Sequence, residues 1–147
     1  MIVKVFKVVW FLSLLATMTV FLYVYASLPE DILVWEREVP QFISRNGLFY
    51  SGLALLAIIN ALIFIVSRLY DHEKNAYFLA WFYGLVGFLN LFLVVTFQFI
   101  SLYNSQEKFN YDSIGYIVYG SVGLVVIWSG LWPVYFIGQR FFNKQSI

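Results

Sequence analysis

The 147-residue sequence contains no cysteine and only one histidine, His72. The lack of cysteine excludes disulfides, thiolate metal sites, iron–sulfur clusters, haem attached through CxxCH and a cysteine nucleophile. Asp71 and Glu73 flank the histidine, but adjacent side chains on a turn seldom converge on one ion, and no second cluster has ligand spacing. We therefore predict no metal site and no bound cofactor.

Charged residues are also scarce, at 12% of the chain against roughly a quarter in an average soluble domain. The formal net charge of +1 gives no electrostatic reason to expect a nucleic-acid partner. Hydrophobic residues make up 62% of the chain, so too few charges remain to cover a water-facing surface. This composition predicts an integral membrane protein whose immediate partner is the lipid bilayer.

Four apolar stretches are long enough to cross a bilayer, which takes about 20 helical residues. They cover residues 5–26, 48–66, 76–102 and 114–137, and none has an ionisable residue in its middle. At this length only helices satisfy their own backbone hydrogen bonds in lipid. The predicted fold is therefore an all-α integral membrane protein, with residues 1–147 forming a single four-helix transmembrane domain.

Lysine and arginine are unevenly divided between the two ends of these helices. Six lie at the termini and in the turn over residues 68–75, namely Lys4, Lys7, Arg68, Lys74, Arg140 and Lys144. Three lie in the other two loops, over residues 27–47 and 104–112, namely Arg37, Arg45 and Lys108. The positive-inside rule then places both termini in the cytoplasm. The expected location is the inner (plasma) membrane.

Aromatic residues collect near both ends of the predicted spans. Several tyrosines lie toward the outer ends, and four tryptophans lie toward the cytoplasmic ends, namely Trp10, Trp81, Trp128 and Trp132. Rings with one polar edge favour the headgroup level of a membrane. We expect these side chains to anchor the helices rather than to bind a stacked ligand.

The loop over residues 27–47 is too apolar for a segment that lies fully in water. It carries Ile32, Trp35 and Phe42 beside several charged residues, and Pro40 prevents one continuous helix through it. A short interfacial segment fits this composition, with its apolar groups in the headgroup zone. The segment is either a flap that covers the helices or a docking strip, in which Ile32, Trp35 and Phe42 would contact a partner.

Asn60 and Asn90 are the most informative polar residues inside the predicted spans. Each amide carries donors and an acceptor that need partners in lipid. The two side chains either pair with each other or face another helix or subunit. Their usual role is to hold helices together, which is worth about 0.6–2 kcal/mol. A substrate or ion site is the alternative, although uncharged amides are weak ion ligands.

Small residues mark places where helix backbones can approach closely. Ala57 and Ala61 form such a pair in the second span, and Ala80 and Gly84 form one in the third. In the fourth span, Gly120, Gly123 and Gly130 leave a groove along the helix. We predict that this groove packs against a neighbouring helix or a partner.

One segment resembles a known family. The segment begins with Leu28-Pro29-Glu30-Asp31-Ile32 and continues with Phe42-Ile43-Ser44 and an apolar stretch that contains Asn60. It is similar to the LP-x-x-I/V turn that follows the first helix of SdpI-like small bacterial inner-membrane proteins of the toxin-immunity type. The resemblance covers residues 25–64. The family's usual histidine, asparagine and glycine loop residues are missing, so no functional residue is transferred. The resemblance implies a bacterial inner-membrane protein with an immunity or sensing role.

These patterns predict a protein that is not an enzyme. The sequence has no Ser-His-Asp set, paired carboxylates or phosphate-binding loop, and no ionisable residue at membrane depth of the kind that transporters retain. The favoured function is a non-catalytic accessory or scaffolding subunit that packs against other membrane protein subunits. The alternatives are an SdpI-like immunity or sensing protein, and a small transporter or channel with Asn60 and Asn90 lining its site.

Overall fold

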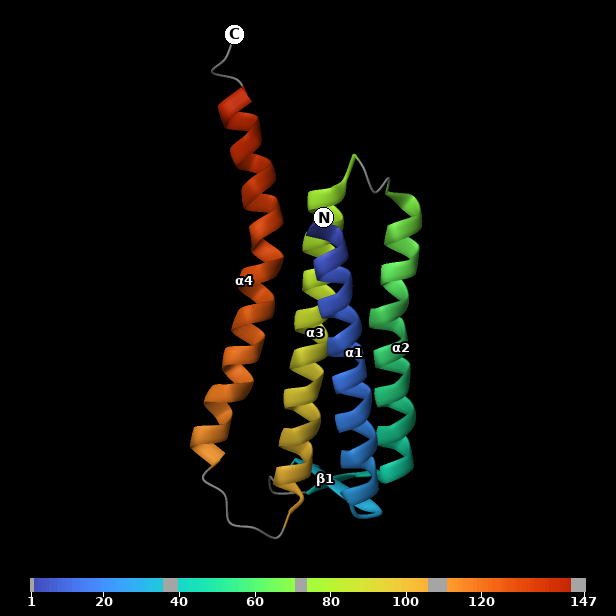
Figure 1. Cartoon of the computed structure of the whole chain (residues 1–147). Helices are drawn as coiled ribbons and strands as arrows, with labels where there is room; N and C mark the ends of the chain where they lie inside the picture. The colour runs from blue at the N-terminus through green and yellow to red at the C-terminus, as the bar shows by residue number, and fades with distance from the viewer. Residues whose placement is uncertain (1, 36–39, 71–73, 106–110, 144–147) are drawn as a thin grey trace.

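The chain forms four long helices and one short β-hairpin. The computed structural model describes residues 2–35, 40–70, 74–105 and 111–143, without the side chains of residues 35, 111–114 and 140–143. The elements are α1 (Ile2–Ser27), β1 (Asp31–Trp35), β2 (Gln41–Ser44), α2 (Arg45–Leu69), α3 (Ala76–Tyr103) and α4 (Tyr111–Asn143). Both termini lie at one end of the helices and the hairpin lies at the other (Figure 1).

Each predicted span corresponds to one of these helices. All four helices are long and apolar enough to cross a membrane, which is the pattern of a multi-pass membrane protein. The helices extend past the predicted spans because an apolar stretch marks only the part suited to hydrocarbon. Lys4 and Lys7, for example, lie within the first turns of α1 with exposed side chains.

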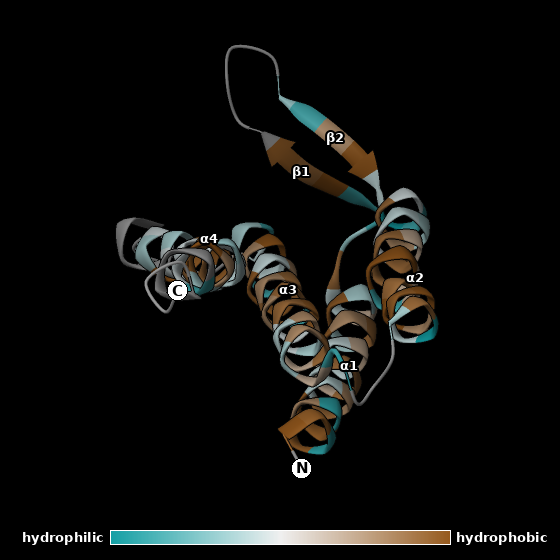
Figure 2. Ribbon diagram, turned by 90° about the horizontal axis from the view of Figure 1, so that it is seen from above, coloured by the Kyte–Doolittle hydropathy of each residue, from teal (hydrophilic) through white to brown (hydrophobic). Residues whose placement is uncertain are grey.

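The helices α1, α2 and α3 form a bundle, and α4 lies beside it. Contacts with α3 dominate the packing of each of the other helices, and α1 and α2 also touch each other. Seen from above, α4 stands on the side of α3 that faces away from α2 (Figure 2). The central helix α3 is therefore the one against which the other three helices pack.

Two apolar clusters fill the bundle. The cluster nearer the hairpin consists of Phe21, Val24, Leu28, Ile32, Leu56, Leu93 and Phe97. The cluster nearer the termini consists of Trp10, Ile63, Tyr83 and Val86. No described residue of α4 belongs to either cluster, so the buried core is built by α1, α2, α3 and the hairpin.

The loop predicted over residues 27–47 contains an antiparallel hairpin of Asp31–Trp35 and Gln41–Ser44. Its position at the membrane interface stays a prediction. Asp31 pairs with Ser44, and the register shifts after Leu33, which pairs with Phe42. The all-α prediction missed these strands because they are short and lie between helices. Ser44 also caps α2, since its hydroxyl accepts a hydrogen bond of 3.1 Å from the Gly47 N–H.

The three residues predicted as partner contacts in this loop have different positions. Ile32 is 0% exposed and belongs to the buried core, which agrees with the alternative of a flap that covers the helices: its side chain anchors the hairpin to them. Phe42 is 60% exposed and remains available at the surface. The side chain of Trp35 lies outside the described residues.

Candidate functional site

Asn60 of α2 and Asn90 of α3 face each other inside the bundle. Asn60 Nδ2 donates to Asn90 Oδ1 at 2.9 Å, and Asn90 Nδ2 donates back to Asn60 Oδ1 at 3.1 Å. Asn60 is 6% exposed and Asn90 is 0% exposed. The structure thus shows one of the two arrangements that the sequence left open, in which the two amides pair with each other.

Three side chains of α1 complete this pair into a connected set. Trp10 Nε1 donates to Asn60 Oδ1 at 2.8 Å, and Asn90 Nδ2 donates to Ser13 Oγ at 3.1 Å. Thr17 Oγ1 donates to the Asn90 carbonyl at 3.2 Å. Spacings of three and four residues place these side chains of α1 on one face of the helix. We call Trp10, Ser13, Thr17, Asn60 and Asn90 the amide network.

The amide network satisfies its own hydrogen-bonding groups. The Nδ2 group of Asn60 donates to Asn90 and to the Leu56 carbonyl, and the Nδ2 group of Asn90 donates to Ser13 and Asn60. Both protons of each amide are therefore in use. Among the described side chains, the only buried nitrogen or oxygen atom without a partner is Arg45 Nε, at the start of α2. The network ties three helices together and offers no free amide proton to a ligand.

The position of Trp10 corrects the interpretation of this residue as an interfacial anchor. It is 6% exposed and lies roughly two turns into α1, which begins at Ile2. Its ring centroid is 5.7 Å from that of Tyr83. In the sequence, the spacing of Trp10, Ser13 and Thr17 indicates that they share one face of the helix. A count of residues from the helix end does not show this.

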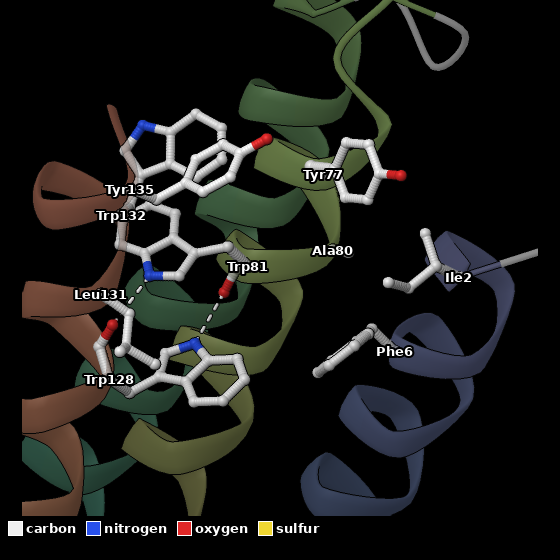
Figure 3. A pocket seen from close by; sticks show the side chains of 9 residues that line it. All are labelled: Ile2, Phe6, Tyr77, Ala80, Trp81, Trp128, Leu131, Trp132 and Tyr135. Atoms are coloured by element: carbon white, nitrogen blue, oxygen red, sulfur yellow. Dashed lines mark hydrogen bonds between the residues drawn. The ribbon is translucent and has the colours of Figure 1, made fainter. Parts of the chain in front are cut away.

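A reciprocal contact between two tryptophans joins α3 to α4. Trp81 Nε1 donates to the Trp128 carbonyl at 2.8 Å, and Trp128 Nε1 donates to the Trp81 carbonyl at 2.9 Å. Figure 3 shows both bonds. We call this arrangement the tryptophan clasp. These two bonds from an indole to a helix carbonyl join α4 to α3.

Gly84 provides the space that the clasp requires. A Cβ atom added at Gly84 would lie 2.6 Å from Cζ2 of Trp128, which is closer than real Cβ contacts. Ala80, one turn earlier, is 2% exposed. The predicted small-residue pair in the third span is therefore the place where the indole of α4 approaches the backbone of α3.

Beside the clasp lies an apolar groove of about 220 Å³. Ile2 and Phe6 of α1 form one wall, Ala80 of α3 lies at its floor, and Trp128, Trp132 and Tyr135 of α4 form the other wall (Figure 3). None of the described residues that line it is charged. The α4 helix packs mainly on α3, and the rings of Phe6 and Trp128 also bring it to α1, with centroids 5.9 Å apart. We call this hollow the aromatic groove.

The predicted glycine surface of α4 faces open space. An added Cβ at Gly120, Gly123 or Gly130 would meet no atom within 4 Å. These glycines therefore make no close contact with another described part of the chain. Together with Phe42, they are the predicted contact residues that remain at the surface, whereas Asn60, Asn90 and Ile32 are used inside the bundle.

Within the described ranges, no group of three or more histidine, cysteine, aspartate or glutamate side chains is placed to hold a metal ion. Asp71, His72 and Glu73, for which the sequence predicts a turn without a metal site, lie outside these ranges. In the middle of each described helix, the polar side chains are amides, hydroxyls and the polar edges of aromatic rings.

Comparisons with protein-family models, with curated proteins and with solved structures gave no significant match. The similarity of residues 25–64 to SdpI-like proteins thus stays a prediction from the sequence.

Proposed function

We propose that this chain is a non-catalytic accessory or scaffolding subunit of a larger membrane complex, in which α4 packs against an apolar helix of an unlike subunit. The observation that carries the proposal is the exposure of α4. In an apolar stretch of 18 residues in α4, 6% of the residues are buried. The corresponding share is 17% in α1 and 22% in both α2 and α3. Because α4 contacts its own bundle along one face, the remaining faces of this helix are available to a partner.

Exposed apolar side chains alone do not support a partner, because lipid tails solvate them as well as another helix does. The glycines of α4 are more informative. A glycine inside a helix is about 0.8–1 kcal/mol less favourable than alanine, and Gly120, Gly123 and Gly130 gain no internal packing in return. Small residues allow close approach of a second membrane helix, so contact with another chain would account for them.

The amide network also supports packing over transport. A transporter site formed by Asn60 and Asn90 would need free donors or acceptors that face a pathway. In this chain both amides are buried, and their protons are bound to Ser13, Leu56 and each other. They act as interhelical contacts, which leaves the surface of α4 as the main candidate for function.

We place the protein in a bacterial inner membrane with both termini in the cytoplasm. Support comes from the division of lysine and arginine between the two ends of the helices and from the resemblance of residues 25–64 to SdpI-like proteins. The hairpin would then lie on the outer face, and the aromatic groove would open near the cytoplasmic boundary.

The proposal is tested by purifying the tagged full-length chain from its native membranes in mild detergent and identifying proteins that remain bound. Gly123→Leu and Gly130→Leu fill the open surface of α4. Ala57→Leu and Ala61→Leu are matched controls, because these residues are exposed on α2. We expect a membrane partner that is retained by the controls and reduced at least tenfold by the two α4 variants, with helicity and melting temperature no lower than those of the unaltered chain.

Two results would contradict the proposal. One is a monodisperse monomer that carries no other protein out of its native membranes. The other is a partner that the two α4 variants retain as well as the unaltered chain does. Altered survival of toxin-exposed cells on deletion, without any bound partner, would instead favour the immunity role.

A further inference from the structure

A second hollow lies at the opposite end of the molecule from the aromatic groove, against the hairpin. Its volume is about 170 Å³. Leu33 and Ile43 of the two strands form one side, Leu48 of α2 contributes to the wall, and Phe99 and Ile100 of α3 form the other side. We call it the hairpin cavity. It is independent of α4 and of the function proposed above.

Hydrogen bonds and buried side chains hold the hairpin against the helices, so the strand side of this cavity keeps its position. Asn104, just after α3, accepts a hydrogen bond from the Leu33 N–H at 2.7 Å and donates to the Leu33 carbonyl at 3.1 Å. The same side chain donates to the Ile100 carbonyl at 2.9 Å. On the adjacent position of β1, the fully buried Ile32 is embedded in the core. These contacts hold the strand away from α3 at a set distance.

The lining of the hairpin cavity does not suit water. A buried water needs two to four polar partners, whereas the lining side chains carry one polar group, the Tyr103 hydroxyl, and the backbone groups of Leu33 are bound to Asn104. An empty apolar cavity lowers the stability of a fold in proportion to its volume. An apolar occupant would remove this cost without breaking a hydrogen bond.

The size of the cavity limits the occupant. An enclosed cavity of about 150 Å³ lined by leucine, isoleucine and phenylalanine stays dry and binds benzene or xenon. The hairpin cavity is slightly larger and mostly apolar, but it is open on one side. Val34, which also lines it, is 55% exposed, so the cavity is open where β1 leaves the bundle. An apolar group can therefore enter without unfolding of the helices.

We propose that the hairpin cavity binds one small apolar group, of the size of a benzene ring or a short alkyl segment. The cavity lies at the end of α3 and the beginning of α2, at the boundary of the apolar helices. A free hydrophobic molecule and the end of a lipid chain can both reach this level. The occupant links the hairpin to α2 and α3 by filling the space between them.

Photolabelling of the full chain in lipid nanodiscs tests this inference. One arm uses a free medium-chain alcohol that carries a diazirine, and the other uses phosphatidylcholine with a diazirine at the end of one acyl chain. Labelled residues are identified by mass spectrometry. We expect labelling of Phe99 and Ile100 at least fivefold above that of the exposed α2 residues Ile58 and Phe64. The arm that gives this enrichment identifies the source of the occupant.

Two variants that fill the cavity complete the test. Leu48→Trp fills it from α2 and Ile43→Phe fills it from the hairpin, and Leu53→Trp is a control on the exposed surface of α2. We expect the filling variants to reduce labelling of Phe99 and Ile100 at least fivefold and to keep the original melting temperature, while the control keeps the labelling. No enrichment from either probe, or equal labelling of a folded filling variant, would overturn the inference.

Discussion

Asn60 and Asn90 are separated by 30 residues in the sequence, and their carboxamides exchange two hydrogen bonds across the α2–α3 interface. The bonded geometry fixes the register of the two helices, because a shift of either one would leave amide groups unpaired in lipid. The indole of Trp10 adds α1 to the same centre. The bundle is therefore aligned by a few polar bonds within an apolar core.

Replacing either asparagine by leucine should destabilise the bundle. We expect Asn60→Leu and Asn90→Leu each to lower the free energy of unfolding by about 1–2 kcal/mol, because each leaves buried partners unsatisfied. The double variant should lose less than the sum of the two, since the second substitution removes a partner that is already unpaired. Unfolding in mixed micelles measures all three values.

Ala61→Leu is the matched control for this cycle, because it adds leucine beside Asn60 on an exposed position of α2. It should leave the free energy of unfolding within about 0.5 kcal/mol of the original value. Additivity of the two asparagine variants within about 0.5 kcal/mol would show that the amides do not act as a pair.

The helices follow from the sequence because each apolar stretch reaches the length that a bilayer demands, which is a local property. The amide network is less visible. Asn60 and Asn90 are recognisable as polar residues in apolar surroundings, but which face of α1 meets them depends on how three helices rotate. The sequence therefore predicts an interfacial position for Trp10, because the distance of a residue from the helix end does not show toward which neighbour its side chain points.

The hairpin shows a second limit of the sequence. Strands of five and four residues give too short an alternation to distinguish them from an apolar loop. Their attachment depends on Asn104, which is 71 residues from Leu33. The open surface of α4 is a third case: the glycines are evident, but only the packed structure shows that no described part of the chain covers them.

Two glycine-to-alanine substitutions should change the free energy of unfolding in opposite directions. Gly84→Ala places a methyl group against the ring of Trp128, and we expect it to lower the free energy of unfolding by about 1–3 kcal/mol through overpacking. Gly130→Ala meets no neighbouring atom and should raise it by up to about 1 kcal/mol through helix propensity. Thermal unfolding of the isolated chain compares the two. Equal effects would mean that the clasp tolerates a shift of α4.

The hydrogen bonds from Asn104 should protect one backbone amide of the hairpin. Asn104→Ala removes the acceptor for the Leu33 N–H, and we expect exchange of this amide with deuterium to become about tenfold faster, the equivalent of one hydrogen bond of about 1.4 kcal/mol. Ser105→Ala is the control, because among the described residues the Ser105 hydroxyl donates to the Leu102 carbonyl and not to the hairpin. Unchanged exchange in the Asn104 variant would show that another contact holds β1.

The orientation of the helices is open to direct measurement because the chain has no cysteine, so one introduced thiol gives an unambiguous signal. Lys4 and Ser105 are exposed at opposite ends of the helices. If lysine and arginine set the orientation, a membrane-impermeant maleimide should label Ser105→Cys in intact spheroplasts and Lys4→Cys only after lysis. The reversed pattern would place the hairpin in the cytoplasm and move the aromatic groove to the outer face. Labelling of both variants before lysis would show leaking cells, which a cytosolic thiol protein detects.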